Sequence, residues 1–182
     1  TESPPLLVAN TTMAVAGHSH AVCSGRRFVA AVGIAAHTQT VHVIGTAMVA
    51  TNHSNVSCSG TENYLAAVGV AVDSFDCTSL LVVANTTMAV AGHCFAACSG
   101  GLDHSVTVGV TVYCLTVHII GMAMVAADHS NVWCSGTDHA IAALGVAVYP
   151  SDRTSSLLVV NTTMAVAGHS HAASNGDFVV AA

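Results

Sequence analysis

The sequence of 182 residues predicts an all-β, repeat-built fold, either a β-solenoid or an antiparallel sandwich or barrel. Two observations carry this prediction. A phrase that begins Asn-Thr-Thr-Met-Ala-Val-Ala-Gly-His occurs three times, and within each repeat apolar side chains alternate with small or polar ones. The first observation indicates one supersecondary unit used again and again, and the second is the period of a β-strand.

The repeats divide the chain into about five units of 35–40 residues. The phrase starts at Asn10, Asn85 and Asn161, and a second, related phrase starts at Thr40 and returns at Thr116. The units therefore alternate in the order A-B-A-B-A, with bounds of about 1–33, 34–69, 70–109, 110–145 and 146–182. Two independent domains would leave the final unit without a partner, so we expect a single continuous repeat domain over residues 1–182.

Alternation is strictest in the stretch from Val106 to Tyr113, where every second residue is valine. The shorter runs "VGVAV" and "MAVAG" show the same pattern, and turn signals such as "CSG" and "SNG" separate them. Two strong strands in each unit make about ten strands in all, and the Val, Thr and Gly content disfavours helix. The side chains expected to be buried are Val70, Met88, Val90, Val108, Val110 and Val146.

Charge is scarce: the chain has no Lys, only three Arg and a formal net charge of −6. Without a basic stripe it cannot neutralise many phosphates, so we expect no nucleic-acid partner. The longest apolar runs stop near a dozen residues, whereas a membrane-spanning helix needs about 20. We therefore expect no membrane insertion.

Several features are typical of a secreted protein. The chain starts at Thr1 without Met or a hydrophobic leader, as a processed protein would. Seven cysteines, four of them in the "CSG" turns, predict either one to three disulfides or structural thiols. Five sequons predict glycosylation at Asn10, Asn52, Asn55, Asn85 and Asn161. We expect an extracellular location.

Histidine is the most conspicuous polar residue, with twelve copies. His18 and His20, like His169 and His171, lie two positions apart, so on a strand each pair would point to one face and could chelate Zn or Cu. The alternative interpretation is that histidine serves as an uncharged turn residue, because the middle copy has Phe95 where the second His would be. We expect no other cofactor.

Catalysis is not expected. The chain has no G-x-S-x-G elbow, no Gly-rich phosphate loop and no paired acids. Repeated His and Cys residues seldom mark one unique active site. The sequence therefore favours a protein that is not an enzyme.

The favoured function is a structural, self-assembling extracellular protein, such as the subunit of a fibre, filament, sheath or matrix. Natural sheet edges are often protected by Lys, Pro or other charged residues, and this chain has no Lys and only three Pro, two of them at the N-terminus. Its apolar C-terminal stretch also lacks the polar cap of stacked-repeat proteins. We expect a head-to-tail contact between copies, formed by Phe178, Val179 and Val180 with Leu6, Leu7 and Val8.

Two other functions are consistent with the sequence. Ice binding, as in an antifreeze β-solenoid, is favoured by low charge and by strands rich in Thr, Ala and Val, but the "NTT" motif recurs only about every 75 residues. The third is a glycan- or metal-binding repeat module. The shortage of aromatic residues argues against sugar stacking.

Overall fold

The computed structural model describes residues 4–26, 29–38, 40–60, 65–73, 79–100, 105–114, 116–135, 140–150, 156–175 and 178–179. All regular structure in these residues is β-strand, which confirms the all-β, repeat-built fold. None of the described residues belongs to a helix that could cross a membrane.

The chain winds through four strands in each turn, which we call a coil. Coil 1 holds β1 (Leu6–Ala9), β2 (Thr12–Ala16), β3 (His20–Gly25) and β4 (Val29–His37). Coil 2 holds β5 (Thr40–Ile44), β6 (Ala47–Thr51), β7 (Asn55–Gly60) and β8 (Leu65–Asp73). Coil 3 holds β9 (Leu80–Ala84), β10 (Thr87–Ala91), β11 (Phe95–Gly100) and β12 (Ser105–Cys114). Coil 4 holds β13 (Thr116–Ile120), β14 (Ala123–Ala127), β15 (Asn131–Ser135) and β16 (Ala140–Pro150), and coil 5 holds β17 (Ser156–Val160), β18 (Thr163–Val166), β19 (His171–Asn175) and β20 (Phe178–Val179).

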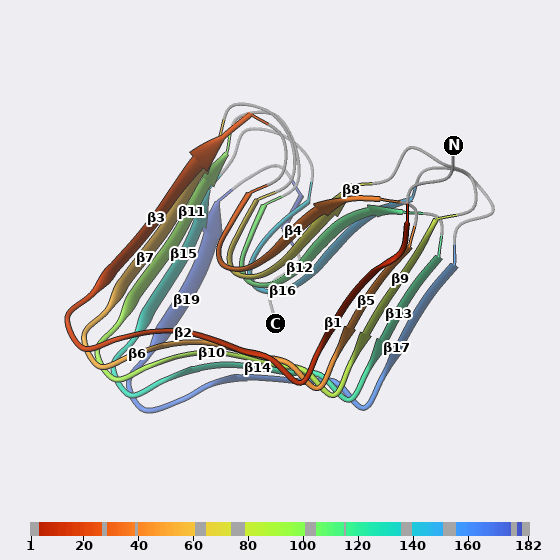
Figure 1. Cartoon of the computed structure of the whole chain (residues 1–182). Coiled ribbons are helices and arrows are strands. Elements are labelled where there is room, and N and C mark those ends of the chain that lie inside the picture. Colours follow the sequence, from red (N-terminus) through yellow and green to blue (C-terminus); the bar gives the residue numbers. More distant parts are fainter. Residues whose placement is uncertain are drawn as a thin grey trace.

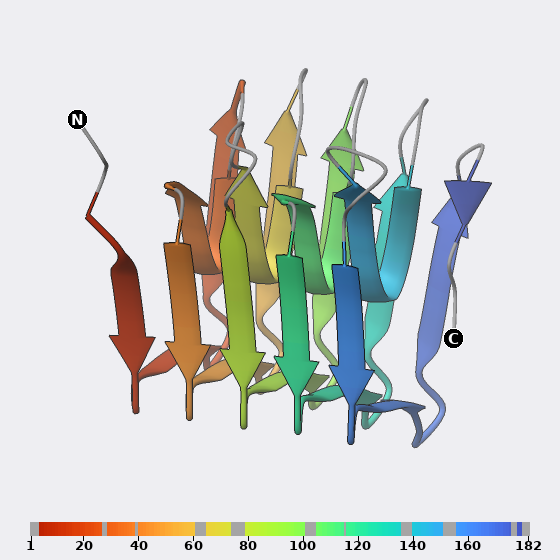
Figure 2. The ribbon, with the colours of Figure 1, turned by 90° about the vertical axis from the view of Figure 1, so that its right-hand side faces the viewer.

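The coils stack into four parallel sheets of five strands each (Figures 1 and 2). The first sheet has the order β1-β5-β9-β13-β17, and the second, third and fourth sheets collect the second, third and fourth strands of each coil in the same way. Paired residues lie one repeat apart in the chain, as Leu6 with Val41 and Thr40 with Leu80. The molecule is therefore a β-solenoid, and the alternative of an antiparallel sandwich or barrel is wrong.

The number of strands differs from the expected ten, because each unit contributes four strands rather than two. What the sequence shows as one run, such as the stretch from Leu6 to Ala16, turns a corner at Asn10 and continues as a second strand. One Asn at such a corner is a weak turn signal in a run of this composition. One sequence unit is thus one full coil.

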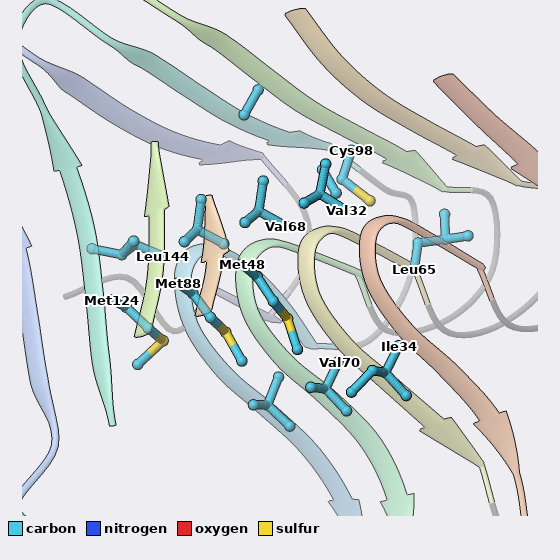
Figure 3. Packing of buried hydrophobic residues seen from close by; sticks show 14 of the residues in the cluster. Val32, Ile34, Met48, Leu65, Val68, Val70, Met88, Cys98, Met124 and Leu144 are labelled. Carbon is cyan, nitrogen blue, oxygen red and sulfur yellow. The ribbon is translucent and has the colours of Figure 1, made fainter. Parts of the chain in front are cut away.

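Parallel pairing in register stacks like residues on one another. The clearest column runs through the second sheet, where a methionine from each coil pairs with the next: Met13, Met48, Met88, Met124 and Met164. The central three are fully buried, and they project into the interior among valines and leucines of other sheets (Figure 3). Of the side chains expected in the core, Val70, Met88, Val90, Val108 and Val110 are buried and Val146 is partly buried.

The strands of the fourth sheet bend toward the interior (Figure 1), and glycine lies within the bent strands. Gly33, Gly69, Gly109 and Gly145 pair in one column with φ values from 149° to 158°. A Cβ atom on Gly69 would lie 1.8 Å from the carbonyl oxygen of Gly109. Only glycine therefore allows neighbouring coils to approach at this column.

The two outer corners use residues that tolerate the left-handed conformation. Between the first and second sheets the corner residue alternates between Asn and Gly, with φ values from 49° to 64°: Asn10, Gly45, Asn85, Gly121 and Asn161. A Cβ on Gly45 would lie 2.6 Å from Asn10 Oδ1, so the Asn side chain fills the space above a Gly. The A-B alternation of the sequence therefore has a packing cause.

Candidate functional site

The corner between the second and third sheets carries a ladder of histidines: His18, His53, His93, His129 and His169. Successive ring centroids are 4.8, 5.0, 4.8 and 5.2 Å apart, and all five residues are exposed. Each has a φ value between 58° and 64°, a conformation in which His, Asn and Asp are enriched. The backbone of the corner explains why histidine recurs there.

The predicted metal-ligating pairs do not have the expected strand geometry. His18 lies in the corner and stacks on His53, whereas His20 begins β3 and pairs with Asn55. His169 and His171 repeat this arrangement at the other end of the solenoid, in coil 5. Among the described residues, no three His, Cys, Asp or Glu side chains gather to form a metal site.

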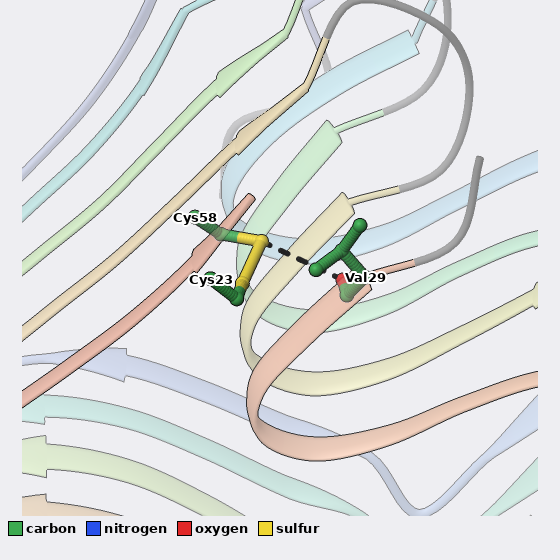
Figure 4. The surroundings of a disulfide bond; sticks show 3 residues. All are labelled: Cys23, Val29 and Cys58. Atoms are coloured by element: carbon green, nitrogen blue, oxygen red, sulfur yellow. Dashed lines mark hydrogen bonds between the residues drawn. A yellow bond between two sulfur atoms is a disulfide. The ribbon is translucent and has the colours of Figure 1, made fainter. Parts of the chain in front are cut away.

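Cysteines form a second column, in the third sheet. Cys23 and Cys58 are joined by a disulfide that links coils 1 and 2, and Cys58 Sγ lies 3.6 Å from the carbonyl oxygen of Val29 (Figure 4). Cys98 and Cys134 continue the column and are buried, and Ser174 takes the position in coil 5. The disulfide is consistent with the expectation of oxidised cysteines.

The sequon asparagines lie on the outside of the solenoid. Asn10, Asn52, Asn85 and Asn161 are exposed corner residues, and Asn55 is partly exposed on β7. The amide oxygens of Asn10 and Asn85 face the glycine of the next coil. A glycan on these two residues would have to displace that contact.

The outer faces of three sheets are free of charge. The strands of the first, second and third sheets contain no Asp, Glu, Lys or Arg. On the second sheet the outward column alternates between Thr and Ala: Thr12, Ala47, Thr87, Ala123 and Thr163. Monomeric soluble proteins seldom expose wide surfaces of such low polarity without a function.

Coil 5 exposes side chains that belong to core columns. Leu157 is 55% exposed and Met164 is 41% exposed, whereas Val117 and Met124, directly below them in coil 4, are fully buried. Of the assembly residues expected from the sequence, Leu6 and Val8 point inward in β1 and Leu7 is 63% exposed. Phe178 and Val179 form β20, which pairs with β16, and Val180 lies outside the described residues.

A groove on the outer face of the third sheet was not predicted from the sequence. It has a volume of about 470 Å³ and is lined by Phe95, Asn131, Val132, Trp133, His171 and Ala173. Phe95 pairs with Asn131, and Trp133 is two residues further along β15. Nothing in the sequence indicates this groove, because the two aromatic residues lie in different repeats. They become neighbours only through the pairing register of β11 with β15.

The comparisons with known proteins give no relative. No family model, no curated protein and no solved structure matches the chain. Function must therefore be argued from the surfaces described above.

Proposed function

We propose that this protein is a structural, self-associating extracellular protein, the subunit of a fibre, filament, sheath or matrix. The observation that carries the proposal is the open core of coil 5, where Leu157, Val159, Met164 and Val166 are all more than one-third exposed. Because these side chains are already about half buried, covering each one would stabilise an assembly by about half of the 1.5–3 kcal/mol that full burial contributes. Another coil stacked on this surface would bury all four.

Coil 1 of a second copy has the matching side chains. In β1 and β2 the inward residues are Leu6, Val8, Met13 and Val15, which are the same residue types in the same order as on coil 5. The edges of β1 and β17 also have a strand partner on one side only. Stacking coil 1 on coil 5 would pair these edges in parallel and continue the methionine column.

The corner between the first and second sheets disfavours a head-to-tail contact in which every residue pairs in register. Within the chain an Asn always meets a Gly in the next coil, because the Asn amide occupies the space of a Cβ. A head-to-tail contact would instead place Asn161 against Asn10 of the second copy, and one side chain would have to rotate away. Asn10→Gly should remove this conflict.

The uncharged sheet faces and the disulfide support the same proposal. Faces without like charges let neighbouring filaments lie side by side, since no repulsion keeps them apart. The disulfide between Cys23 and Cys58 is typical of an oxidising, extracellular environment. Glycosylation at the exposed corner asparagines would be compatible with that location.

The experiment is sedimentation velocity over a concentration series, combined with electron microscopy of the same samples. We expect the intact chain to form filaments, Asn10→Gly to form them at lower concentration, and the double variant Val159→Lys with Met164→Lys to sediment as a monomer. Thr163→Lys is the matched control, because Thr163 lies on β18 but faces outward. A monomer for the intact chain at millimolar concentration would contradict the proposal.

Ice binding is a second candidate, favoured by the second sheet. Its outward columns of Thr, Ala and Val form a regular face of small side chains, with strands about 4.8 Å apart. Thermal hysteresis of the monomeric Val159→Lys, Met164→Lys variant tests this candidate. If the face binds ice, this variant should show thermal hysteresis, and the added substitution Thr87→Lys should abolish it. The absence of thermal hysteresis would exclude ice binding.

A further inference from the structure

We propose that the groove on the third sheet is a binding site for a neutral glycan chain. The proposal is independent of self-association, because the groove lies on an outer face and uses none of the residues on the open core of coil 5. It rests on the side chains that β11, β15 and β19 bring together: two exposed aromatic rings beside an amide and an imidazole.

The chain has few aromatic residues, and two of them, Phe95 and Trp133, are exposed in the groove. Phe95 is 42% exposed and Trp133 is 43% exposed. Trp133 pairs with Ala97 on one side and Ala173 on the other, so small side chains flank the indole ring on both neighbouring strands. Phe95 is the diagonal neighbour of Trp133. The spacing between strands and the rise of two residues along a strand place the two Cα atoms about 8 Å apart. The face therefore presents two separated apolar rings.

Polar groups complete the site. Asn131 and His171 pair with each other in the column that also contains Phe95, and both are exposed. An amide offers a donor and an acceptor, and an imidazole and the indole N–H add further hydrogen-bonding groups. Flat apolar rings beside such groups match a sugar ring, which has an apolar C–H face and a rim of hydroxyls.

The absence of charged side chains in the lining of the groove disfavours charged ligands. None of the lining residues is Asp, Glu, Lys or Arg, so the groove has no strong partner for a phosphate, a sulfate, a carboxylate or an ammonium group. The lining residues come from three neighbouring strands of the outer face, β11, β15 and β19, and such a surface site suits an extended chain more than a small enclosed cofactor. A neutral oligosaccharide fits both properties.

The site is held on a rigid support. The hydroxyl of Thr107, in the adjacent fourth sheet, donates a hydrogen bond of 2.6 Å to the carbonyl oxygen of Trp133. Val132 and Cys134, on either side of Trp133, point inward and are buried. The backbone that presents the indole is thus fixed before a ligand arrives, which lowers the entropic cost of binding.

The sole tryptophan of the chain is Trp133, so its intrinsic fluorescence reports on this site alone. The experiment titrates the full chain with neutral hexasaccharides of glucose and of N-acetylglucosamine, in β-1,4 and α-1,4 linkage, and repeats each titration by calorimetry. We expect a saturable fluorescence change with at least one of them. Phe95→Ala and Asn131→Ala should each weaken binding about tenfold, and Trp133→Ala should abolish the calorimetric signal.

Asn55→Ala is the matched control. Asn55 occupies the position of Asn131 in the other B coil, but Ser57 stands there where coil 4 has Trp133. The control should bind like the unaltered chain. Folding of every variant is checked by far-UV circular dichroism.

Two outcomes would overturn the proposal. One is the absence of any fluorescence or calorimetric response to all the oligosaccharides while the chain remains folded. The other is a fluorescence change that appears only with protein concentration and not with sugar, which would show that the groove is a contact between copies of the chain.

Discussion

Among the described residues, two kinds of turning place, the inner bend of the fourth sheet and the outer corners, are built differently. At the bend, glycine recurs in every full coil, because the carbonyl of the next coil occupies the position of a Cβ. At the corner between the second and third sheets, the residue with positive φ before the histidine is Gly, Asn or Asp. A Cβ on Gly92 would lie 3.0 Å from the backbone nitrogen of Asn52 in the preceding coil, which is a tight contact but far less severe than the 1.8 Å at the bend.

A turning place can restrict the choice of residue for two reasons, the space for a Cβ atom and the backbone conformation. The bend needs glycine because a Cβ would overlap the backbone carbonyl of the next coil, whereas the corners first need residues that accept a left-handed backbone and leave somewhat more room for a Cβ. Gly17, in coil 1, isolates the conformational requirement, since nothing lies within 4 Å of its missing Cβ, unlike those of Gly92 and Gly168. Stability should therefore respond more strongly to substitutions at the bend than at the corners, and least of all at Gly17.

The largest effect is expected for Gly109→Ala. Its Cβ would lie 1.8 Å from the carbonyl oxygen of Gly145, which belongs to the backbone of the paired strand β16 and cannot move aside as the end of a side chain could. We expect a loss of about 4 kcal/mol or more in the free energy of unfolding, measured by urea denaturation with circular dichroism. Gly17→Ala is the control and should cost about 1 kcal/mol. Equal losses for the two variants would show that conformation, and not space, explains the bend.

A smaller effect is expected at His93, where φ is 61°. Valine is β-branched and strained in this conformation, whereas asparagine adopts it readily. Both substitutions remove the ring that stacks on His53 and His129, so their difference reports the backbone alone. We expect His93→Val to be less stable than His93→Asn by about 1–2 kcal/mol in the same assay. If the two variants are equally stable, ring stacking is the reason for histidine.

The Asn-Gly alternation can be tested with a double-mutant cycle. A Cβ on Gly121 would lie 2.8 Å from Asn85 Oδ1, which is the mobile end of a side chain. Gly121→Ala should therefore cost about 1 kcal/mol more in the natural background than beside Asn85→Gly. Additive free energies would mean that the Asn side chain does not fill this space.

The smallest effect is expected for Cys94→Ser. The other four coils have serine in this column, and Ser130 donates a 2.6 Å hydrogen bond to Ala127 as Cys94 does to Ala91 at 2.9 Å. A serine hydroxyl can make the same bond, so the free energy of unfolding should stay within about 0.5 kcal/mol. A larger loss would indicate that the thiol has a role beyond the packing of its column.

The sequence was sufficient for the repeat and the all-β class, because both depend on patterns within one unit. It was insufficient for the number of strands, since corners at single residues such as Asn10 leave the apolar alternation almost unchanged. It also missed the groove, because Phe95 and Trp133 are close only when coil 3 and coil 4 are paired in the correct register. Contacts between repeats depend on register, which a pattern within one repeat does not contain.

The alternation of Asn and Gly at the corner between the first and second sheets also restricts the number of coils that can be added or lost at one time. Loss or gain of one coil would place Asn on Asn or Gly on Gly, but loss or gain of a pair of coils leaves every column intact. Deletion of Met13–Thr87, for example, joins Thr12 to Met88 and recreates the same phrase at the junction. Recombination between the repeated phrases would thus lengthen or shorten the solenoid in steps of two coils, and each product would inherit a complete set of corners, bends and core columns.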